Sequence, residues 1–398
     1  MTARAHNRTA LVSNGAPDAA TGESYRGIRR ICFVAPRAYN VLAQRSDLTH
    51  VGGAEVQVVS LARALAAIGY QVQFVTLDYG QPDEQDVDGI TVYKSYAQSA
   101  GLPLIRFAHP RWTGVCRALH RANADMYIQA GADGLTGQVA LWCRRHRRRF
   151  TFLAMSDEDC VARSSFLPAW RDRKLFDIGV RRADCVVVQS HRQQRLLRQS
   201  RGVDSVVIRP CVLHGDADCR RCRYVDSGPR ALWLGRFSPE KRIEWLLDIA
   251  GACPDVEFDI VGGANSDDDY ATGFIDRARA LPNVHLAGHV AYAQVGGYYA
   301  GAQVLLLTSR QEGFPTVFME AWRYGLPTVS TIDVDDLIAD KGLGAVADTV
   351  EEMVAALRDI LSSRRRWCQC SDQARAHFLA AHTPAAAARA MKDIVIEA

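Results

Sequence analysis

The sequence is short of features that often reveal a function at once. No apolar run in its 398 residues approaches the length of a membrane span, and the net charge of +4 is too small to indicate nucleic-acid binding. Residues 1–27 are rich in Ala, Thr, Ser and Gly but have no apolar core, so we expect a disordered tail and no signal peptide. These absences favour a cytoplasmic protein, long enough for two domains.

Two common nucleotide-binding motifs are also missing. No Gly-x-Gly-x-x-Gly follows the first expected strand, which disfavours a nicotinamide-binding Rossmann enzyme. No Gly-Lys-Ser/Thr loop is present, which removes the P-loop nucleotide hydrolases from consideration. Any nucleotide must therefore be held by other means.

The eleven cysteines form no disulfide framework, because most are scattered singly through expected strands and helices. Four residues nevertheless suggest a zinc site, namely Cys211, His214, Cys219 and Cys222. They contain a single Cys-x-x-Cys, and the other spacings match no common zinc finger. We therefore expect a reduced, partly exposed loop and no metal, with zinc as the alternative.

Strands alternate with helices along two stretches of the chain. The first stretch has a helix over 54–68 and strands over 30–35, 72–77, 89–94, 124–129, 150–155 and 185–189. The second has strands over 231–235, 258–261, 284–287, 304–307 and 328–330, followed by helices from residue 350. This alternation predicts two doubly wound α/β domains with parallel sheets, over residues 28–209 and 230–383, joined by a connection over 210–229.

The most informative segment contains Glu312 and Glu320, with seven residues between them. After the apolar strand over 304–307, Gly313 and Pro315 end the strand and start a helix, with Pro315 suited to the first turn. Backbone N–H groups at such a helix start favour an anion. Glu312 lies in the preceding loop, whereas Glu320 lies more than a turn into the helix and can accept hydrogen bonds from hydroxyls. A ligand that offers a phosphate to the helix start and hydroxyls to the carboxylate is a sugar nucleotide.

The segment over 309–322 resembles the donor-binding signature of the family-4 retaining glycosyltransferases, which have the GT-B fold. The resemblance continues at 233–242, 259–263 and 51–55, and it covers nearly the whole chain from about residue 28. It implies two Rossmann-like domains with a cleft between them, the first for the acceptor and the second for the nucleotide sugar. It also implies that the helix over 384–398 crosses back to the first domain.

The resemblance assigns roles to particular residues. It places Glu320 on the ribose hydroxyls of the donor and directs Glu312 toward the donor sugar. It implies that Arg236 and Lys241 hold the diphosphate and neutralise the leaving group, so that neither a metal nor a cofactor is expected. The remaining donor-binding residues that it implies are Gly52, Gly53, Gly313, Phe314, Pro315 and Thr316. For the Gly52-Gly53 turn, a simple need for positive φ is the alternative.

Two interpretations remain open for Asp157 and for a run of arginines. Asp157 follows an expected strand where family members often carry a histidine, and it either contacts an acceptor or donor hydroxyl or caps a helix. Five arginines end the helix that begins near residue 134, namely Arg144, Arg145, Arg147, Arg148 and Arg149. They are either a solvated helix C-terminus or a patch for anionic lipid headgroups. No aromatic platform accompanies them, so nucleic acid is not expected.

The interpretation that combines these features is a retaining glycosyltransferase. We expect it to transfer sugar from a nucleotide-diphosphate sugar to a saccharide or lipid-linked acceptor, in cell-surface polysaccharide or glycoconjugate biosynthesis. The enzyme is expected in the cytoplasm, at the membrane face if the arginines bind lipid. Two alternatives are a GT-B sugar-nucleotide epimerase, which needs no acceptor, and a catalytically silent protein that binds a nucleotide or a partner.

Overall fold

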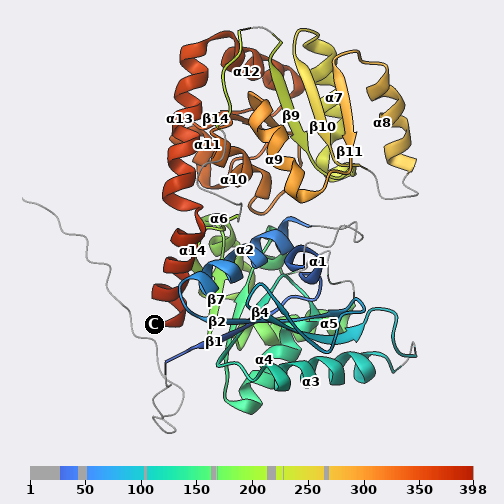
Figure 1. Ribbon diagram of the computed structural model, residues 1–398, viewed down its shortest axis with the longest axis vertical. Helices are drawn as coiled ribbons and strands as arrows, with labels where there is room; N and C mark the ends of the chain where they lie inside the picture. Colours follow the sequence, from blue (N-terminus) through green and yellow to red (C-terminus); the bar gives the residue numbers. More distant parts are fainter. Residues whose placement is uncertain are drawn as a thin grey trace, which may run out of the picture.

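The computed structural model describes residues 27–43, 52–102, 105–162, 167, 169–212, 221–226, 228–263 and 269–397. Its strands form two separate sheets, one in each half of the chain, each flanked by helices (Figure 1). The predicted pair of doubly wound α/β domains is therefore confirmed. The expected tail lies outside the described residues, apart from Gly27.

The sheet of the first domain has the order β3-β4-β2-β1-β5-β6-β7-β8. Its strands are β1 Arg30–Val34, β2 Gln71–Asp78, β3 Glu84–Val87, β4 Ile90–Ala97, β5 Met126–Ala130, β6 Arg149–Leu153, β7 Cys185–Val188 and β8 Val206–Val207. All neighbours pair in parallel except β3, which pairs antiparallel with β4 through a turn at Asp88 and Gly89. The expectation of a wholly parallel sheet was wrong at this edge, because an Asp-Gly pair with positive φ at both residues makes a tight hairpin.

Successive side chains of β1 point to opposite faces of the sheet, and both faces are covered by helices. Ile31 and Phe33 pack with helices α1 Tyr39–Leu42 and α2 Gly53–Ala67, whereas Cys32 and Val34 point to the opposite core. The helices on that opposite face are α3 Thr113–Ala122, α4 Gly134–His146, α5 Trp170–Arg181 and α6 His191–Arg201. Burial on both faces explains why these strands are continuous apolar runs.

The second domain has the sheet order β11-β10-β9-β12-β13-β14, with all pairs parallel. Its strands are β9 Arg230–Leu234, β10 Glu257–Val261, β11 Val284–Gly288, β12 Val304–Leu307, β13 Thr328–Ser330 and β14 Gly344–Val346. Its helices are α7 Ile243–Ala252, α8 Asp269–Arg279, α9 Tyr292–Gly301, α10 Thr316–Tyr324, α11 Leu337–Lys341, α12 Val350–Ser362 and α13 Arg364–Ala381. The strand order reverses between β9 and β12, so the loops that leave these two strands border a crevice.

The end of the chain packs on the first domain. Helix α14 Pro384–Met391 lies against the β1 and α2 core through Ala388 and Met391, next to the segment Lys392–Ile396 (Figure 1). Arg149 donates to the backbone oxygens of Val395 and Ile396, at 2.7 and 3.0 Å. Arg149 therefore ties down the C-terminal segment, and its assignment to a lipid-binding patch was wrong.

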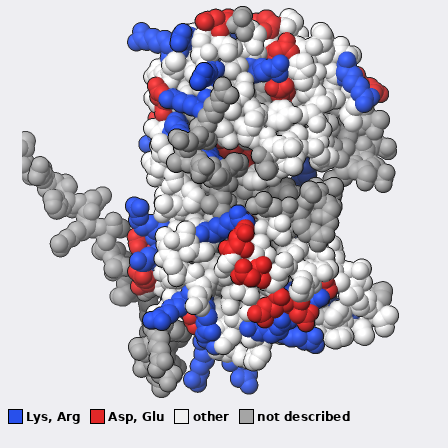
Figure 2. Space-filling model, in the orientation of Figure 1, with Lys and Arg blue, Asp and Glu red and all other residues white. Residues whose placement is uncertain are grey.

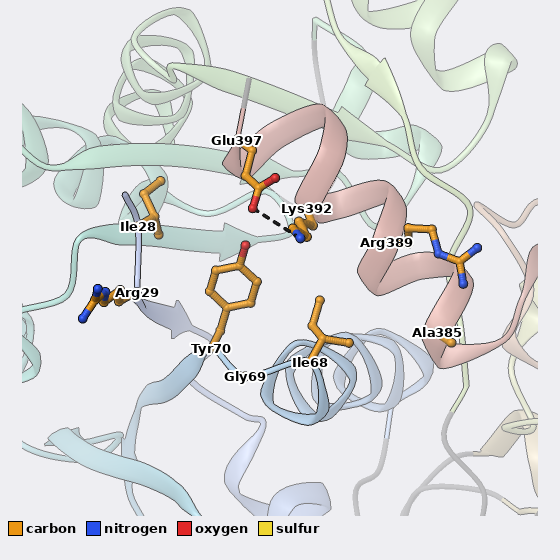
Figure 3. Close-up of a pocket in the computed structure, with 9 residues that line it drawn as sticks. All are labelled: Ile28, Arg29, Ile68, Gly69, Tyr70, Ala385, Arg389, Lys392 and Glu397. Carbon is orange, nitrogen blue, oxygen red and sulfur yellow. Dashed lines mark ion pairs between the residues drawn. The ribbon is translucent and has the colours of Figure 1, made fainter. Parts of the chain in front are cut away.

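A cavity of about 480 Å³ lies where this C-terminal segment meets the first domain (Figure 3). Its lining residues are Ile28, Arg29, Ile68, Gly69, Tyr70, Ala385, Arg389, Lys392 and Glu397. Because Arg29 and Tyr70 precede β1 and β2, the cavity lies at the amino ends of the strands. The cavity is therefore at the opposite end of the first-domain sheet from the carboxyl ends of its strands.

Two of the four residues that suggested a zinc site belong to different cores. Cys211 is buried in the first domain, and burial raises the pKa of its thiol to about 12. Cys222 is buried in the second domain, where its thiol contacts the backbone oxygen of Gly325 at 3.1 Å. The expectation that these two are partly exposed was wrong. His214 and Cys219 lie outside the described residues, and the described residues contain no group of three potential ligands.

One carboxylate joins the two domains directly. Asp335, in the second domain, accepts hydrogen bonds from the backbone N–H groups of His191 and Arg192, at 2.9 and 3.0 Å, at the start of α6. It also pairs with Arg209 at 2.7 Å. Burial by itself raises the pKa of Asp335, but these N–H donors and Arg209 together hold it below its ordinary value. Asp335 is thus an anion at a helix N-terminus, supplied across the domain boundary.

Replacing this charge is expected to loosen the domain contact. We expect Asp335→Asn to weaken it by about 1.5–3 kcal/mol, the range for hydrogen bonds to a charged group. Small-angle X-ray scattering should then give a larger radius of gyration. The matched control is Asp336→Asn, because Asp336 is exposed and also has a positive φ that Asn tolerates. Equal radii for both variants and the unsubstituted protein would contradict the proposed contact.

Candidate functional site

The loops that leave β9 and β12 carry most of the predicted site residues. The carbonyl oxygen of Gly235, after β9, occupies the place where a Cβ on Gly262, after β10, would lie. Gly262 also has a φ of +121°, a conformation that favours glycine. The two strand ends can therefore approach closely, and the loop with Arg236 and Lys241 runs directly over the carboxyl end of the sheet.

Glu312 is held by two partners at this edge. Its Oε1 accepts a hydrogen bond from Ser309 Oγ at 2.8 Å and forms an ion pair with Lys241 Nζ. Both charged side chains are mostly buried, with exposed fractions of 18% for Glu312 and 19% for Lys241. The structure thus joins two of the predicted residues, one from each loop.

The alternative role for Glu312, as a cap for the following helix, is contradicted. Helix α10 begins at Thr316 with Pro315 as its N-cap, and no side chain accepts a capping hydrogen bond there. The expectation that Pro315 lies in the first helical turn was wrong by one residue. Pro315 has extended backbone angles at this cap.

The neighbouring cations have different surroundings. Arg236 has a side chain that is 67% exposed and lies 3.5 Å from Glu240. Arg242, in contrast, donates to the backbone oxygens of Thr308 and Ser309 and stacks 3.9 Å from the ring centre of Trp245. Arg242 therefore fastens the loops of β9 and β12 together, whereas Arg236 is accessible to a ligand.

Glu320 lies in α10 and inside the domain. It is 5% exposed, and its two carboxylate oxygens accept hydrogen bonds from Tyr292 and Tyr299 at 2.8 and 2.6 Å. Burial raises the pKa of Glu320 above its ordinary 4.5, against the opposing effect of the two tyrosine hydroxyls. Both tyrosines come from α9, so that helix fixes the orientation of the carboxylate.

The N-terminal ends of α2, from the first domain, and α10, from the second domain, lie close together. A Cβ on Gly53, at the start of α2, would lie 2.6 Å from Thr316 Oγ1, at the start of α10. Gln57 bridges the same gap, since its Nε2 donates to Thr316 Oγ1 at 2.9 Å and to the backbone oxygen of Phe314 at 3.2 Å. Gly52 is the N-cap of α2 and is exposed. The partial positive charges of both helix ends therefore act on the same region.

The loop before α10 also touches the first domain. A Cβ on Gly313 would lie 2.8 Å from the backbone oxygen of Met155, so only glycine fits there without displacement. Phe314 packs 5.1 Å from the ring of His382, whose Nδ1 donates to the backbone oxygen of Pro210 at 2.8 Å. Burial lowers the pKa of His382 to about 3, so it is neutral at physiological pH.

Asp157 is 5% exposed and accepts a hydrogen bond from Arg192 Nε at 2.7 Å. Burial raises the pKa of its carboxyl, and Arg192 opposes this effect. Asp157 does not cap the following helical turn, because Ser156 is the N-cap and Asp159 completes the capping box. Asp157 thus has no capping role, and its contact with a sugar hydroxyl stays a prediction.

Several site residues were not predicted from the sequence. Tyr292 and Tyr299 are seven residues apart and lie on one face of α9, a spacing that could have identified them as a pair. Gln57 and Asp335 act across the domain boundary, and no local pattern indicates such partners. Ser309 stands three residues before Glu312, a spacing that is common in local hydrogen bonds.

Comparison with known proteins agrees with this geometry. Residues 52–213 match the family described as glycosyl transferase 4-like domain, and residues 228–363 match glycosyl transferases group 1. Each match falls within one of the two domains. A GDP-mannose-dependent alpha-mannosyltransferase of Mycolicibacterium smegmatis is 25% identical over 358 residues, which cover 82% of this chain and 89% of that protein. An amylovoran biosynthesis glycosyltransferase of Erwinia amylovora is 22% identical over 353 residues, 85% of this chain and 96% of that protein.

Solved structures share the fold at low identity. Sucrose-phosphate synthase of Thermosynechococcus elongatus superposes with a TM-score of 0.71 at 18% identity, covering 92% of this chain and 98% of that one. HepE of Anabaena, in complex with UDP and glucose, gives a TM-score of 0.71 at 16% identity with the same coverage. Within the part of the chain that the structure describes, no helix is long and apolar enough to cross a membrane.

The burial of Glu320 predicts how its replacement changes the pH dependence of stability. Its folded pKa is raised, so its contribution to stability is greatest below pH 4.5 and declines as pH rises through the raised value. Glu320→Gln keeps the shape but cannot ionise. We expect its melting temperature to rise relative to the unsubstituted protein as pH increases from about 4.5. The control is Glu351→Gln, in the exposed first turn of α12. A constant difference across this range would show that Glu320 is not desolvated.

Proposed function

Because the chain belongs to the family-4 glycosyltransferases of GT-B fold, which use nucleotide sugars, we propose a specific reaction for it. The enzyme transfers a sugar from a nucleotide-diphosphate sugar to a saccharide or lipid-linked acceptor, with retention of the anomeric configuration. The name of the Erwinia relative, an amylovoran biosynthesis glycosyltransferase, supports a place in cell-surface polysaccharide or glycoconjugate synthesis. We propose that this synthesis takes place in the cytoplasm.

The observation that carries this proposal is the meeting of α2 and α10 at their N-termini. Each helix end carries roughly half a positive charge, and the free N–H groups at both ends can bind phosphate oxygens. Gly53 and Thr316 mark this place, and Arg236 and Lys241 reach the same edge of the second sheet. A diphosphate is the ligand whose charge and size suit two helix ends and two cations.

The same arrangement suggests how the reaction proceeds. Arg236 and Lys241 stabilise the charge that grows on the leaving diphosphate, so we propose that turnover needs no divalent metal. Lys241 pairs with Glu312, which supports a fixed position for this carboxylate. We propose that it stabilises the positive charge that develops at the anomeric carbon. The acceptor hydroxyl attacks the face from which the diphosphate leaves. No protein nucleophile is assigned.

Glu320 has a separate role in this proposal. Its carboxylate is already ordered by Tyr292 and Tyr299, and each oxygen retains a lone pair for a further donor. The ribose hydroxyls of the donor are the groups that we propose it accepts from. This assignment concerns nucleotide binding, whereas that of Glu312 concerns the sugar and the transition state.

The function is tested by screening donors and then identifying products. We expect one class among UDP-, GDP- and ADP-sugars to raise the melting temperature, because a ligand that binds only the folded state stabilises it. The stabilising donor is then incubated with a lipid extract in the presence of a chelator, and the product is examined by NMR for retained configuration. A modified sugar formed from donor alone would indicate an epimerase, and donor binding without any product would indicate a silent protein.

The role of Glu312 predicts a separation of turnover from binding. Glu312→Gln keeps the Ser309 hydrogen bond but removes the negative charge beside the anomeric carbon. We expect turnover to fall by roughly 10²-fold, typical for loss of one transition-state contact, with nucleotide affinity nearly unchanged. Turnover and melting temperature are measured on the same variant, with Glu351→Gln as the control. A full-rate enzyme with slightly lower stability would contradict the catalytic role.

A further inference from the structure

An exposed arginine is held in place by a buried carboxylate at the boundary between the domains. Arg192 Nε donates to Asp157 Oδ2 at 2.7 Å. The exposed fraction of the side chain is 62% for Arg192 and only 6% for Asp157. This contact uses one of the five N–H donors of an arginine, and the four on the two Nη nitrogens remain. None of the described residues forms a hydrogen bond or ion pair with those two nitrogens, so they are available to a ligand.

The pair lies where the donor-binding loop of the second domain touches the first domain. A Cβ on Gly313 would lie 2.8 Å from the Cα of Ser156 and 3.3 Å from Nε2 of Gln193. Asp157 is the residue after Ser156. Arg192 is the residue before Gln193, near the start of α6, which Figure 1 shows between the two sheets. The molecule is narrow there, where the domains meet (Figure 2), so the guanidinium lies beside the cleft.

The main chain of Arg192 is fixed from the other domain. Its backbone N–H donates to Asp335 at 3.0 Å, and Asp335 is balanced by an ion pair with Arg209. The first turn of α6 contains no acidic residue, although the helix dipole disfavours cations at that end. The stability of α6 therefore does not explain why an arginine stands there. Because Asp157 balances its charge, Arg192 recognises a ligand through directed N–H groups and not through a net positive field.

This ion pair differs from those that hold the fold together. Arg201, which pairs with Asp177, has a side chain that is 6% exposed, and it also donates to a backbone oxygen. Arg209 is 22% exposed and likewise donates to a backbone oxygen. In the pair of Arg192 the burial is reversed, because the acid is enclosed and the base is accessible. Burying a carboxylate costs free energy, and here it produces an oriented guanidinium of the kind found in preorganised binding sites.

We propose that Arg192 binds an anionic group of the acceptor, a carboxylate or a phosphate, and that Asp157 is the residue that positions it. A guanidinium presents parallel N–H groups that match the two oxygens of such an anion. The identity of the ligand rests on the proposed function, in which the phosphates and ribose of the donor already have other partners. Asp157 then acts through Arg192, in place of the predicted direct contact with a sugar hydroxyl.

Separating acceptors by charge tests the ligand class. The lipid extract is divided by anion exchange into neutral and anionic fractions, and each is incubated with the full chain and the donor that raises its melting temperature. We expect product from the anionic fraction only. Reduction of carboxyl groups with carbodiimide and borohydride then identifies the anion, since product is lost for a carboxylate and retained for a phosphate. Equal product from the neutral fraction would overturn the inference but leave the proposed function intact. No product from either fraction would refute the proposed function itself.

Replacing Arg192 separates acceptor binding from donor binding. We expect Arg192→Gln to raise KM for the acceptor about 10- to 100-fold, with turnover and the thermal shift by the donor nearly unchanged. Arg192→Lys should restore only part of the loss, because an ammonium lacks the planar fork. The control is Arg198→Gln, on the same helix, whose partner Asp204 is exposed. An unchanged KM would contradict the role of Arg192, and a lost donor shift would assign the residue to the donor and overturn the proposal.

A double-variant cycle tests the positioning role of Asp157. We expect Asp157→Asn to raise KM for the acceptor by less than Arg192→Gln does. If Asp157 acts only through Arg192, the variant with both substitutions should have the same KM as Arg192→Gln alone. A further rise in the double variant would show that Asp157 contacts the substrate itself and would refute the positioning role. The melting temperature of each variant is measured so that rates refer to folded protein.

Discussion

The close approach of the two domains at the cleft is the constraint on which the site depends. Gly53 and Gly313 stand where a Cβ would press on Thr316 Oγ1 or on the backbone of Met155. Larger residues at either position would force the helix ends of α2 and α10 apart. The convergence of positive helix ends, the reach of Gln57 and the contact of Asp335 with α6 all require this short separation. Packing at two glycines therefore sets the electrostatics of the site.

The two glutamates of the signature, Glu312 and Glu320, have different partners because their surroundings differ. Glu312 is mostly buried and pairs with Lys241. Glu320 is enclosed among apolar side chains, where two tyrosine hydroxyls replace the lost water. One carboxylate is thus balanced by a charge and the other by neutral donors. Two chemically identical side chains therefore have different partners, and burial raises the pKa of Glu320.

Much of the fold could be predicted because its strands are buried on both faces and read as unbroken apolar runs, such as 304–307. The strands that were not predicted lack this signal. Strand β3 is Glu-Gln-Asp-Val at an exposed edge, and β8 has only two residues. For the site, a local signature identified Glu312 and Glu320. Gln57 and Asp335 could not be found in that way, because their partners are distant in sequence and only the folded chain brings them together.

Helix α14 gives the molecule a second connection between its domains. The chain leaves the first domain once, near Arg209, and returns to it once, at Pro384. A body attached at one point can swing in any direction, whereas a body attached at two points turns about the line that joins them. The second connection therefore restricts how the two domains can rotate relative to each other.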